Sequence, residues 1–573
     1  TATDRGNLAG NFSGVNPRFS NLQGFVDGQL ATVQVEFDFL ANGRIPGDLV
    51  PGPVAPPNRR FHTRYTDAAW FIQDTWKLTR RLTLTPGLRW EFYGGSSSPG
   101  HERVRDVNFY PGEGGDSYMQ FANGAFQRTL EAPGKYRGHY VLPDRNNFGP
   151  RLGLAFDLTG DGKTVLRAGA GIFFDANYSR AVAALSGRVQ FTNVPFTPEM
   201  LENPYAIAGQ ATSAAPSITR SDPEMEASYT SSWNATIERE LGGKMVLSGS
   251  YVGSSGSGLL LLARENGQGS GRYVGRPGQR ILPNLGYFLT GRNLAHSSYH
   301  GLQLKAEARE IRRLGLQFGA NYTWGHSIDN TSARDTEGQG FSQGFLIDPS
   351  KPRLDRGNSS FDQRQRFVAH FIWKIPAGWS PPGLAKHLAA GWQLSGIVSF
   401  QTGQPFHMFD QGTPDRELNA QRPRLTGPPP RVLRATERIP DPLTPNRFLL
   451  VPANGIRNPD GSCIPNATPF ACVASVHDPL DNLLPRSSYT RPGRRFQDVA
   501  LTRSLQVRES VRVQLRAEFY NLFNHANLQL APLAANNGLT LNAPAFAGGA
   551  VGGVVASYGG TPRQVVVAAK IIF

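Results

Sequence analysis

Apolar and polar residues alternate along several long segments of the chain. In residues 82–92 the even-numbered positions are mostly apolar, while the odd-numbered ones carry Thr83, Thr85, Arg89 and Glu91. The same period of two recurs in residues 164–175, 302–309, 314–324 and 511–520. Successive side chains of a β-strand point to opposite faces, so this pattern predicts strands with one apolar and one polar face.

The alternation predicts about fourteen strands, the first of them faint. They are expected at residues 30–41, 66–77, 82–93, 149–159, 164–175, 228–241, 244–254, 297–309, 314–326, 365–376, 391–402, 495–505, 510–522 and 563–573. Most reach about ten residues, the length that a tilted strand needs to cross a bilayer, whereas strands of soluble sheets average ~5–6 residues. Strand length therefore favours a membrane protein.

The connections between these strands alternate between two sizes. Tight turns are expected at 79–81, 160–162, 242–243, 310–313 and 507–509, and long polar stretches at 94–148, 176–227, 255–296, 327–364, 403–494 and 524–562. Outer-membrane barrels combine short periplasmic turns with long extracellular loops. We therefore predict an all-β fold, a transmembrane antiparallel up-and-down β-barrel. It forms one domain over residues 1–573, with the faintest pattern in residues 1–60.

The C-terminus supports this prediction. Val565, Val567, Ala569, Ile571 and Phe573 share one parity, and the chain ends on the aromatic residue. Outer-membrane barrels end in this way. Phe573 is accordingly predicted to be the C-terminal signal that the barrel assembly machinery reads.

Composition narrows the alternatives. No run of eighteen apolar residues is present and the mean hydropathy is −0.35, so the sequence predicts no transmembrane helix. The 64 Gly and 43 Pro residues fit many turns and loops. The net charge of +15 could attract nucleic acid, but without a Lys/Arg tract we expect none. A soluble β-sandwich, with its aromatic residues packed across strands, stays open as an alternative.

The two cysteines lie close together in a stretch rich in Pro and Asn. Cys463 and Cys472 have no second pair and no histidine cluster nearby, which argues against zinc. We expect a local disulfide formed in an oxidising compartment.

No motif predicts catalysis, a cofactor or a metal site. Residues 157–164 end like a phosphate-binding loop in Gly162, Lys163 and Thr164. However, Asp157 replaces the first glycine and an alternating strand follows, so we interpret the segment as a hairpin turn. The eleven histidines are scattered, and no strand-turn-helix nucleophile motif is present. The protein is therefore not expected to be an enzyme.

Charged residues at the polar positions of the strands are the candidate site. They are predicted to line the barrel interior, where they pair with one another or contact a plug or a solute. They are Arg89, Glu91, Arg167, Glu238, Lys305, Glu307, Arg512, Arg516 and Glu518. The Arg-rich and aromatic loops, above all residues 403–494, are candidate contacts for a ligand or for lipopolysaccharide.

Several segments resemble the C-terminal barrel of TonB-dependent outer-membrane transporters, especially the Oar-like branch with a carboxypeptidase-regulatory-like N-terminal domain. They are residues 69–78, 81–91, 147–156, 161–167, 391–397 and 516–524. The resemblance implies a barrel of about twenty-two strands, filled by a plug whose TonB box is pulled by the inner-membrane TonB complex.

The chain departs from this family by its about fourteen strands and by the lack of a recognisable plug, TonB box or regulatory-like domain. We therefore expect the C-terminal portion of a longer receptor that imports a bulky solute. The expected partners are outer-membrane lipid and lipopolysaccharide, the TonB complex through a missing plug, the barrel assembly machinery and an unknown solute. A passive porin-like channel and a barrel-anchored surface-binding or adhesion protein are the alternatives.

Overall fold

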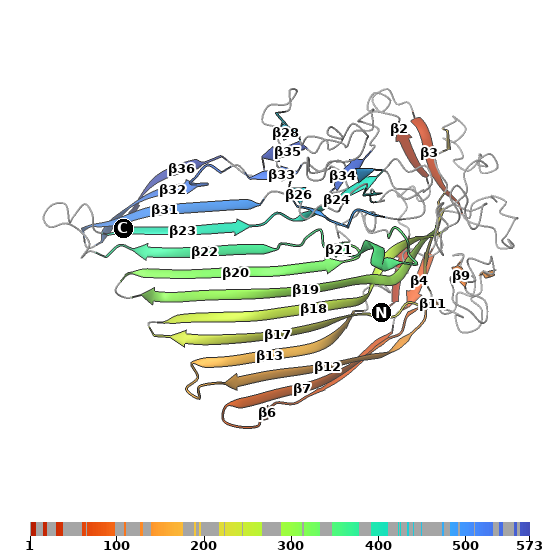
Figure 1. Cartoon of the computed structure of the whole chain (residues 1–573), viewed down its shortest axis with the longest axis horizontal. Helices are drawn as coiled ribbons and strands as arrows, with labels where there is room; N and C mark the ends of the chain where they lie inside the picture. The colour runs from red at the N-terminus through yellow and green to blue at the C-terminus, as the bar shows by residue number, and fades with distance from the viewer. Residues whose placement is uncertain are drawn as a thin grey trace.

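In the computed structural model, one large antiparallel sheet dominates the chain (Figure 1). Residues 66–95, 141–175, 224–265, 290–332, 346–376, 391–405, 482–525 and 562–573 are described, except for a few single positions, together with isolated residues and the backbone of short strands elsewhere. The strands of the main sheet are β5 (Asp67–Gln73), β6 (Trp76–Lys77), β7 (Leu82–Tyr93), β12 (Asp144–Asp157), β13 (Thr164–Asp175), β17 (Ser228–Leu241), β18 (Met245–Glu265), β19 (Phe288–Ile311), β20 (Leu316–Asp329), β22 (Gln365–Lys374), β23 (Trp392–Gln401), β31 (Arg494–Arg508), β32 (Val511–Tyr520) and β36 (Gln564–Ile572).

Short strands accompany this sheet. They are β1 (Ala2–Gly6), β2 (Val15–Phe19), β3 (Leu30–Phe37), β4 (Arg60–Arg64), β8 (Ser96–Ser97), β9 (Asn108–Tyr110), β10 (Gln127–Thr129), β11 (His139–Val141), β14 (Arg188–Gln190), β15 (Val194–Pro195), β16 (Ser217–Ser221), β21 (Gly357–Asn358), β24 (Pro405–Asp410), β25 (Arg424–Leu425), β26 (Leu433–Arg434), β27 (Ile439–Pro440), β28 (Phe448–Leu449), β29 (Val473–Ala474), β30 (Tyr489–Thr490), β33 (Leu528–Leu530), β34 (Gly538–Leu541) and β35 (Val555–Tyr558). One 3₁₀ turn, η2 (Pro352–Asp355), lies between β20 and β21.

The long strands pair in chain order. Antiparallel ladders join each of them to the next, from β5 and β7 through β19 and β20 to β32 and β36. The hairpin turns lie together at one end of the sheet, on the left in Figure 1, which we call the turn end. The opposite end is called the loop end. This is the predicted up-and-down connectivity.

Turn chemistry explains the tight connection between β12 and β13. Both carboxylate oxygens of Asp157 accept backbone N–H groups, from Gly160 at 2.8 Å and Gly162 at 2.9 Å. These two glycines have φ values of 81° and 73°, a region that other residues rarely adopt. Hydrogen bonds from the Thr159 hydroxyl and the Lys163 N–H lower the pKa of Asp161. The segment is a hairpin turn, as predicted.

The strands β18 and β19 are longer than predicted. Residues 255–296 were expected to form a loop because the run Ser254-Ser-Gly-Ser-Gly258 has loop composition. Instead the ladder continues to the pair Glu265 and Phe288, with register shifts between Gly256 and Leu261. The small residues form a bulge, and the pairing of β18 with β19 resumes beyond it.

Two other predicted loops contain regular structure. Residues 327–364 begin with the end of β20 and include η2 and β21, and residues 403–494 begin with β24. Buried carboxylates fix the first of these segments: Asp355 accepts the Ile347 N–H at 2.8 Å and Asp348 accepts the Ser350 N–H at 2.9 Å. Such side-chain contacts leave no periodic signal in the sequence.

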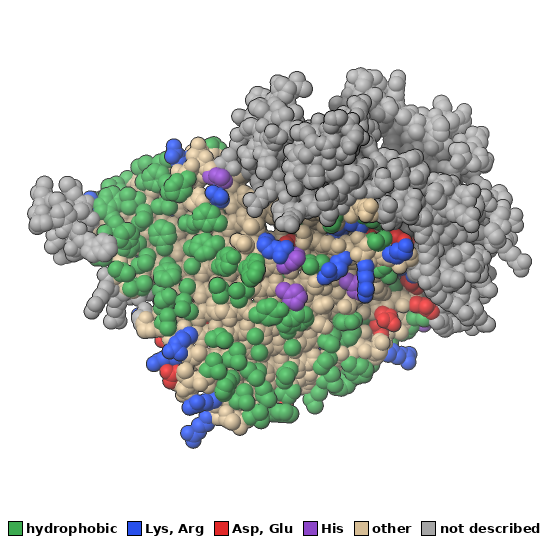
Figure 2. All heavy atoms as spheres, in the orientation of Figure 1, with side chains coloured by type: hydrophobic (Ala, Val, Ile, Leu, Met, Phe, Trp, Pro, Cys, Tyr) green, Lys and Arg blue, Asp and Glu red, His purple; other side chains and the backbone are tan. Residues whose placement is uncertain are grey.

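The two faces of the sheet differ in chemistry. One register row, from β7 to β20, is almost wholly apolar and runs Leu84, Leu154, Ala168, Ala235, Tyr251, Leu302 and Trp324. Figure 2 shows hydrophobic side chains spread widely over this face toward the turn end. Large apolar side chains exposed on this face include Trp70, Leu152, Ile237, Tyr251, Leu304, Trp324, Leu515 and Val567. So large an exposed apolar surface is suited to lipid contact.

Buried apolar residues gather at the loop end instead. One cluster joins Tyr93, Val141, Met225 and Ala227, and another joins Leu261, Ala263, Ala295 and Leu346. Between the loop end and the turn end, the sheet exposes large apolar side chains on its apolar face. This distribution is the reverse of a soluble β-sandwich, in which the apolar faces pack together.

The outermost strands, β5 and β36, are the most exposed. Among the described residues, β5 pairs with β7 and β36 pairs with β32, and every residue of both strands is exposed. Phe573 follows β36 at the turn end and is 91% exposed. No helix among the described residues is long and apolar enough to cross a membrane. Cys463 and Cys472 lie outside the described residues, so the disulfide stays a prediction.

Candidate functional site

The polar face of the sheet carries the predicted site residues. All nine lie on this face by ladder register: Arg89, Glu91, Arg167, Glu238, Lys305, Glu307, Arg512, Arg516 and Glu518. One register row on this face runs Ala155, Arg167, Thr236, Ser250, Gln303, Thr323, Arg366, Gln401 and Arg494. Arg366, at a polar position of the predicted strand 365–376, and Arg494, at the end of the predicted loop 403–494, were not among the predicted site residues. That this face lines a barrel interior stays a prediction.

Six of the nine residues form ion pairs within their own strand. The distances are 2.9 Å between Arg89 Nε and Glu91 Oε1, 2.8 Å between Lys305 Nζ and Glu307 Oε2, and 2.5 Å between Arg516 Nη2 and Glu518 Oε1. Residues i and i+2 of a strand point to the same face, which explains the repeated spacing. We call these three contacts the same-strand pairs.

The other three predicted residues have different surroundings. Arg512 donates to Gln506 Oε1 at 3.1 Å. Arg167 and Glu238 are exposed and form no ion pair with another described residue. The polar face therefore carries both neutralised and unneutralised charge.

Exposed apolar side chains also stand on this face. Ile372, Ile397 and Phe496 lie on the adjacent strands β22, β23 and β31 and are 38%, 58% and 40% exposed. The registers place Ile397 opposite His370 and Asp498, so Ile372 and Phe496 each lie diagonal to Ile397, on either side of it. We call them the inner apolar patch. Exposed apolar residues on an otherwise polar face are suited to contact with another domain or a partner molecule.

Buried arginines organise the loop end. Arg292 Nε lies 2.7 Å from Glu265 Oε1, and its Nη1 lies 2.5 Å from Asp222 Oδ2. Thr290 donates its hydroxyl to the other oxygen of Glu265 at 2.7 Å. Glu265 is completely buried, so its charge depends on these partners.

Two more buried ion pairs join distant parts of the chain at the loop end. Arg486 pairs with Asp329 at the end of β20 and donates to the Asp329 carbonyl at 3.0 Å. Burial lowers the pKa of Arg486 to about 10, so it is still charged at neutral pH. Arg422 Nη2 lies 3.4 Å from Asp355 Oδ1, and its Nη1 donates to the Leu484 carbonyl at 2.9 Å. Neither pair was predicted from the sequence, because the partners lie far apart in predicted loops.

The Asp355 carboxyl is buried, and its burial changes its pKa. Burial raises its pKa to about 6, while Arg422 and the Ile347 N–H act in the opposite direction. Burial also lowers the pKa of Arg422. Among the described residues, no group of His, Cys, Asp and Glu side chains could hold a metal ion.

A search of the curated proteins found no match. Among solved structures, the outer membrane transporter YddB from Escherichia coli matches with a TM-score of 0.37 and 8% identity, over 95% of this chain and 59% of that one. The ferric-catecholate import receptor Fiu from E. coli matches with a TM-score of 0.36 and 10% identity, over 94% and 50%. The siderophore receptor PiuA from Acinetobacter baumannii matches with a TM-score of 0.35 and 9% identity, over 94% and 51%.

The chain thus spans about half the length of these solved structures. A family model described as an outer membrane beta barrel domain matches residues 45–565, which is most of the sequence. Its expected all-β architecture is the one described above. The chain therefore belongs to the outer membrane beta barrel domain family and is a protein of the outer membrane.

Proposed function

We propose that this chain is the barrel of a TonB-dependent receptor that binds a bulky solute at the loop end and imports it into the periplasm. The inner apolar patch is the observation that carries the proposal. Ile372, Ile397 and Phe496 would stand in water in an open channel, at a cost of roughly 25 cal/mol per Å² of apolar surface. A plug domain against the polar face would cover them.

The same-strand pairs support a filled interior in a second way. Each leaves its partners on the polar face with their charges already neutralised, so a plug could pack there without leaving buried unpaired charges. Arg167 and Glu238 would be available to a polar partner. The barrel supplies the outer-membrane passage, and force on the plug would open it.

The passive channel is the second candidate. It is favoured by the exposure of Lys305 and Glu307, whose side chains are 54% and 41% accessible on the polar face. A water-filled interior would solvate them. The two candidates differ in their need for energy.

An uptake assay in the source bacterium separates the candidates. Wild-type cells and cells lacking the gene would be given radiolabelled ferric citrate, a ferric catecholate and a set of oligosaccharides, each with and without a protonophore. The proposal predicts that deletion abolishes uptake of one probe and that the protonophore does the same. Uptake that survives the protonophore indicates a passive channel, and binding without uptake indicates a surface-binding protein.

A further inference from the structure

A cavity lined by several polar and charged residues lies on the apolar face at the loop end, outside the polar-face site. Its volume is about 360 Å³, and β18, β19, β20 and η2 line it. Ser255 pairs with Ser298, which pairs with Ile328, and this register row stands on the same face as Tyr251, Leu302 and Trp324. The cavity therefore opens on the face that meets lipid.

Its depth in the membrane follows from strand geometry. The apolar positions of β19 run from Leu302 to the strand end at Ile311, roughly 30 Å of strand at ~3.3 Å per residue. With a tilt of about 40°, this length covers about 23 Å, close to the ~25 Å apolar band of outer-membrane barrels. Ser298 lies four residues beyond Leu302, roughly 13 Å farther along the strand. With the tight turns on the periplasmic side, as the sequence predicts, that position is at the headgroup level of the outer leaflet.

The cavity has an excess of positive charge. Arg353 and Arg356 are exposed, and neither forms an ion pair with another described residue. Asp329 is the one acidic residue in the lining, and its carboxylate is already paired with Arg486. Two guanidinium groups that no carboxylate of the described residues neutralises provide a site for an anion that accepts several hydrogen bonds.

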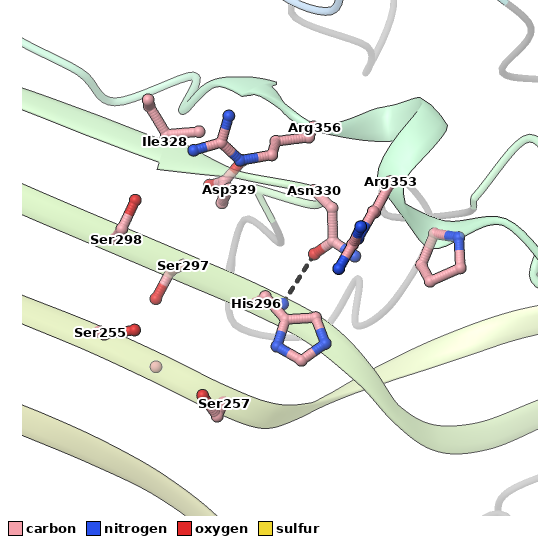
Figure 3. Close-up of a pocket in the computed structure, with 12 residues that line it drawn as sticks. Ser255, Ser257, His296, Ser297, Ser298, Ile328, Asp329, Asn330, Arg353 and Arg356 are labelled. Atoms are coloured by element: carbon pink, nitrogen blue, oxygen red, sulfur yellow. Dashed lines mark hydrogen bonds between the residues drawn. The ribbon is translucent and has the colours of Figure 1, made fainter.

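Local structure positions the two arginines at the cavity. Arg353 lies within η2, and Arg356 follows the turn directly as its C-terminal cap, with extended backbone. The Arg356 N–H donates to the Arg353 carbonyl at 3.1 Å, and the buried pair of Asp355 and Arg422 holds the turn from within. Figure 3 shows Arg356 extending toward Ile328 and Asp329, and Arg353 beside Asn330 and pointing toward His296.

The remaining lining offers neutral hydrogen-bonding groups. The hydroxyls of Ser255, Ser257 and Ser298 make no side-chain hydrogen bond to another described residue. Asn330 holds the strand beside them, because its Oδ1 accepts the His296 N–H at 2.8 Å, and the His296 imidazole is exposed at the cavity (Figure 3). Serine hydroxyls and an imidazole beside two guanidinium groups match a phosphorylated sugar.

We propose that this cavity binds the phosphorylated sugar headgroup of an outer-leaflet glycolipid. Arg353 and Arg356 hold phosphoryl oxygens, and Ser255, Ser298 and His296 meet sugar hydroxyls. The acyl chains then lie along the apolar face beside Leu302 and Trp324. This site is independent of import, because it rests on the membrane position of the barrel and not on a transported solute.

The test uses the full chain, purified from outer membranes in detergent, and bisphosphorylated lipid A as the probe. Binding is measured by native mass spectrometry for the wild type, for Arg353→Ala/Arg356→Ala and for a control, Lys77→Ala/Arg80→Ala. The control removes two exposed basic residues near the turn end. Heat-modifiable electrophoretic migration confirms that every variant is folded.

The double variant at the cavity is expected to bind lipid A at least about tenfold more weakly, because it loses the charge-assisted hydrogen bonds of two guanidinium groups to the phosphates. The control and the wild type should bind alike. Lipid A stripped of its phosphates should bind the wild type as weakly as intact lipid A binds the double variant. The proposal would be overturned if the wild type bound intact and dephosphorylated lipid A equally well. It would also be overturned if the cavity variant bound lipid A as well as the control variant does.

Inorganic phosphate distinguishes the two sources of a phosphoryl group. Millimolar phosphate should leave lipid A bound, since the sugar and acyl contacts are missing from the free ion. Full displacement would overturn the lipid assignment in favour of a soluble phosphate ligand. Uptake by the double variant should equal that of the wild type, so failure of this proposal leaves the import proposal untouched.

Discussion

The ion pairs of the polar face are exposed to solvent, whereas those of the loop end are buried. On the polar face, Lys305 and Glu307 pair within one strand and are about half exposed. At the loop end, Arg292 and Glu265 pair across two strands and are 5% and 0% exposed. Water supports the first kind of pair, whereas the second depends wholly on protein partners. The comparison predicts that the same chemical change has very different consequences at the two places.

Loss of the ion pair between Arg292 and Glu265 should have the largest effect on local stability. Arg292→Met leaves the buried Glu265 carboxylate without its cation, which costs ~3–5 kcal/mol for a broken buried pair. The expected result is local opening of the β18 and β19 ends, seen as faster hydrogen exchange there than in the wild type. The matched control is Arg309→Met, an exposed residue at the turn end of β19. Equal exchange in the two variants would contradict a structural role for Arg292.

The Arg486 pair should show strong coupling. Arg486→Met and Asp329→Asn each leave a buried group unpaired and should increase protease cleavage at the loop end. The double variant removes both charges and should be cleaved less than the sum of the single effects predicts, because the penalty is shared. Limited proteolysis of the three variants measures this coupling. Strictly additive effects would mean that the two side chains act independently.

Asp355 should make the η2 segment sensitive to pH. Its pKa is raised by burial to about 6 in the folded protein, above the 3.8 of the free carboxyl. The folded state therefore binds the proton more tightly, and its stability falls as the pH rises from about 4 to about 6, by roughly 3 kcal/mol at most. Above pH 6 no further change is expected from this group.

Hydrogen exchange of residues 346–358 between pH 4 and 8, corrected for the intrinsic exchange rate, measures this dependence. Asp355→Asn should remove it, since the amide does not titrate. A wild-type profile that is flat across this window, or one that Asp355→Asn leaves unchanged, would show that Asp355 does not control the segment.

The same-strand pairs should give the smallest effect. Glu307→Gln removes one charge from an exposed pair, and solvent replaces the lost contact. The midpoint of urea unfolding in detergent should match the wild type within error, and added salt should erase any difference. A shift as large as that of Arg292→Met would mean that Lys305 and Glu307 are not in water.

The sequence predicted the sheet well because its signal is periodic. Residues 228–241 were predicted and found as β17 without change, and the strand at 82–93 matches β7. The extension of β18 and β19 was missed, because Ser and Gly at 254–258 have the composition of a loop and a bulge carries the ladder through them. Alternation reports which face a residue occupies, and it does so best where one face meets water and the other meets lipid.

The candidate site was likewise predicted only in part. The nine charged residues share one face, as their parity predicted. The contacts of Arg292, Arg422 and Arg486 could not be predicted, because their partners lie in other segments and only the folded backbone brings them together. The cavity at Arg353 and Arg356 was likewise hidden, since η2 lies in a stretch expected to be a loop.

Cysteine labelling along β19 tests the central claim, that one face of the sheet meets lipid and the other an aqueous or plug-filled interior. Single cysteines would replace residues 302–307 in a chain carrying Cys463→Ser and Cys472→Ser, assembled in outer membranes. A lipid-soluble maleimide should label positions 302, 304 and 306, and a charged maleimide positions 303, 305 and 307. Labelling of all six positions by the charged reagent would contradict the account.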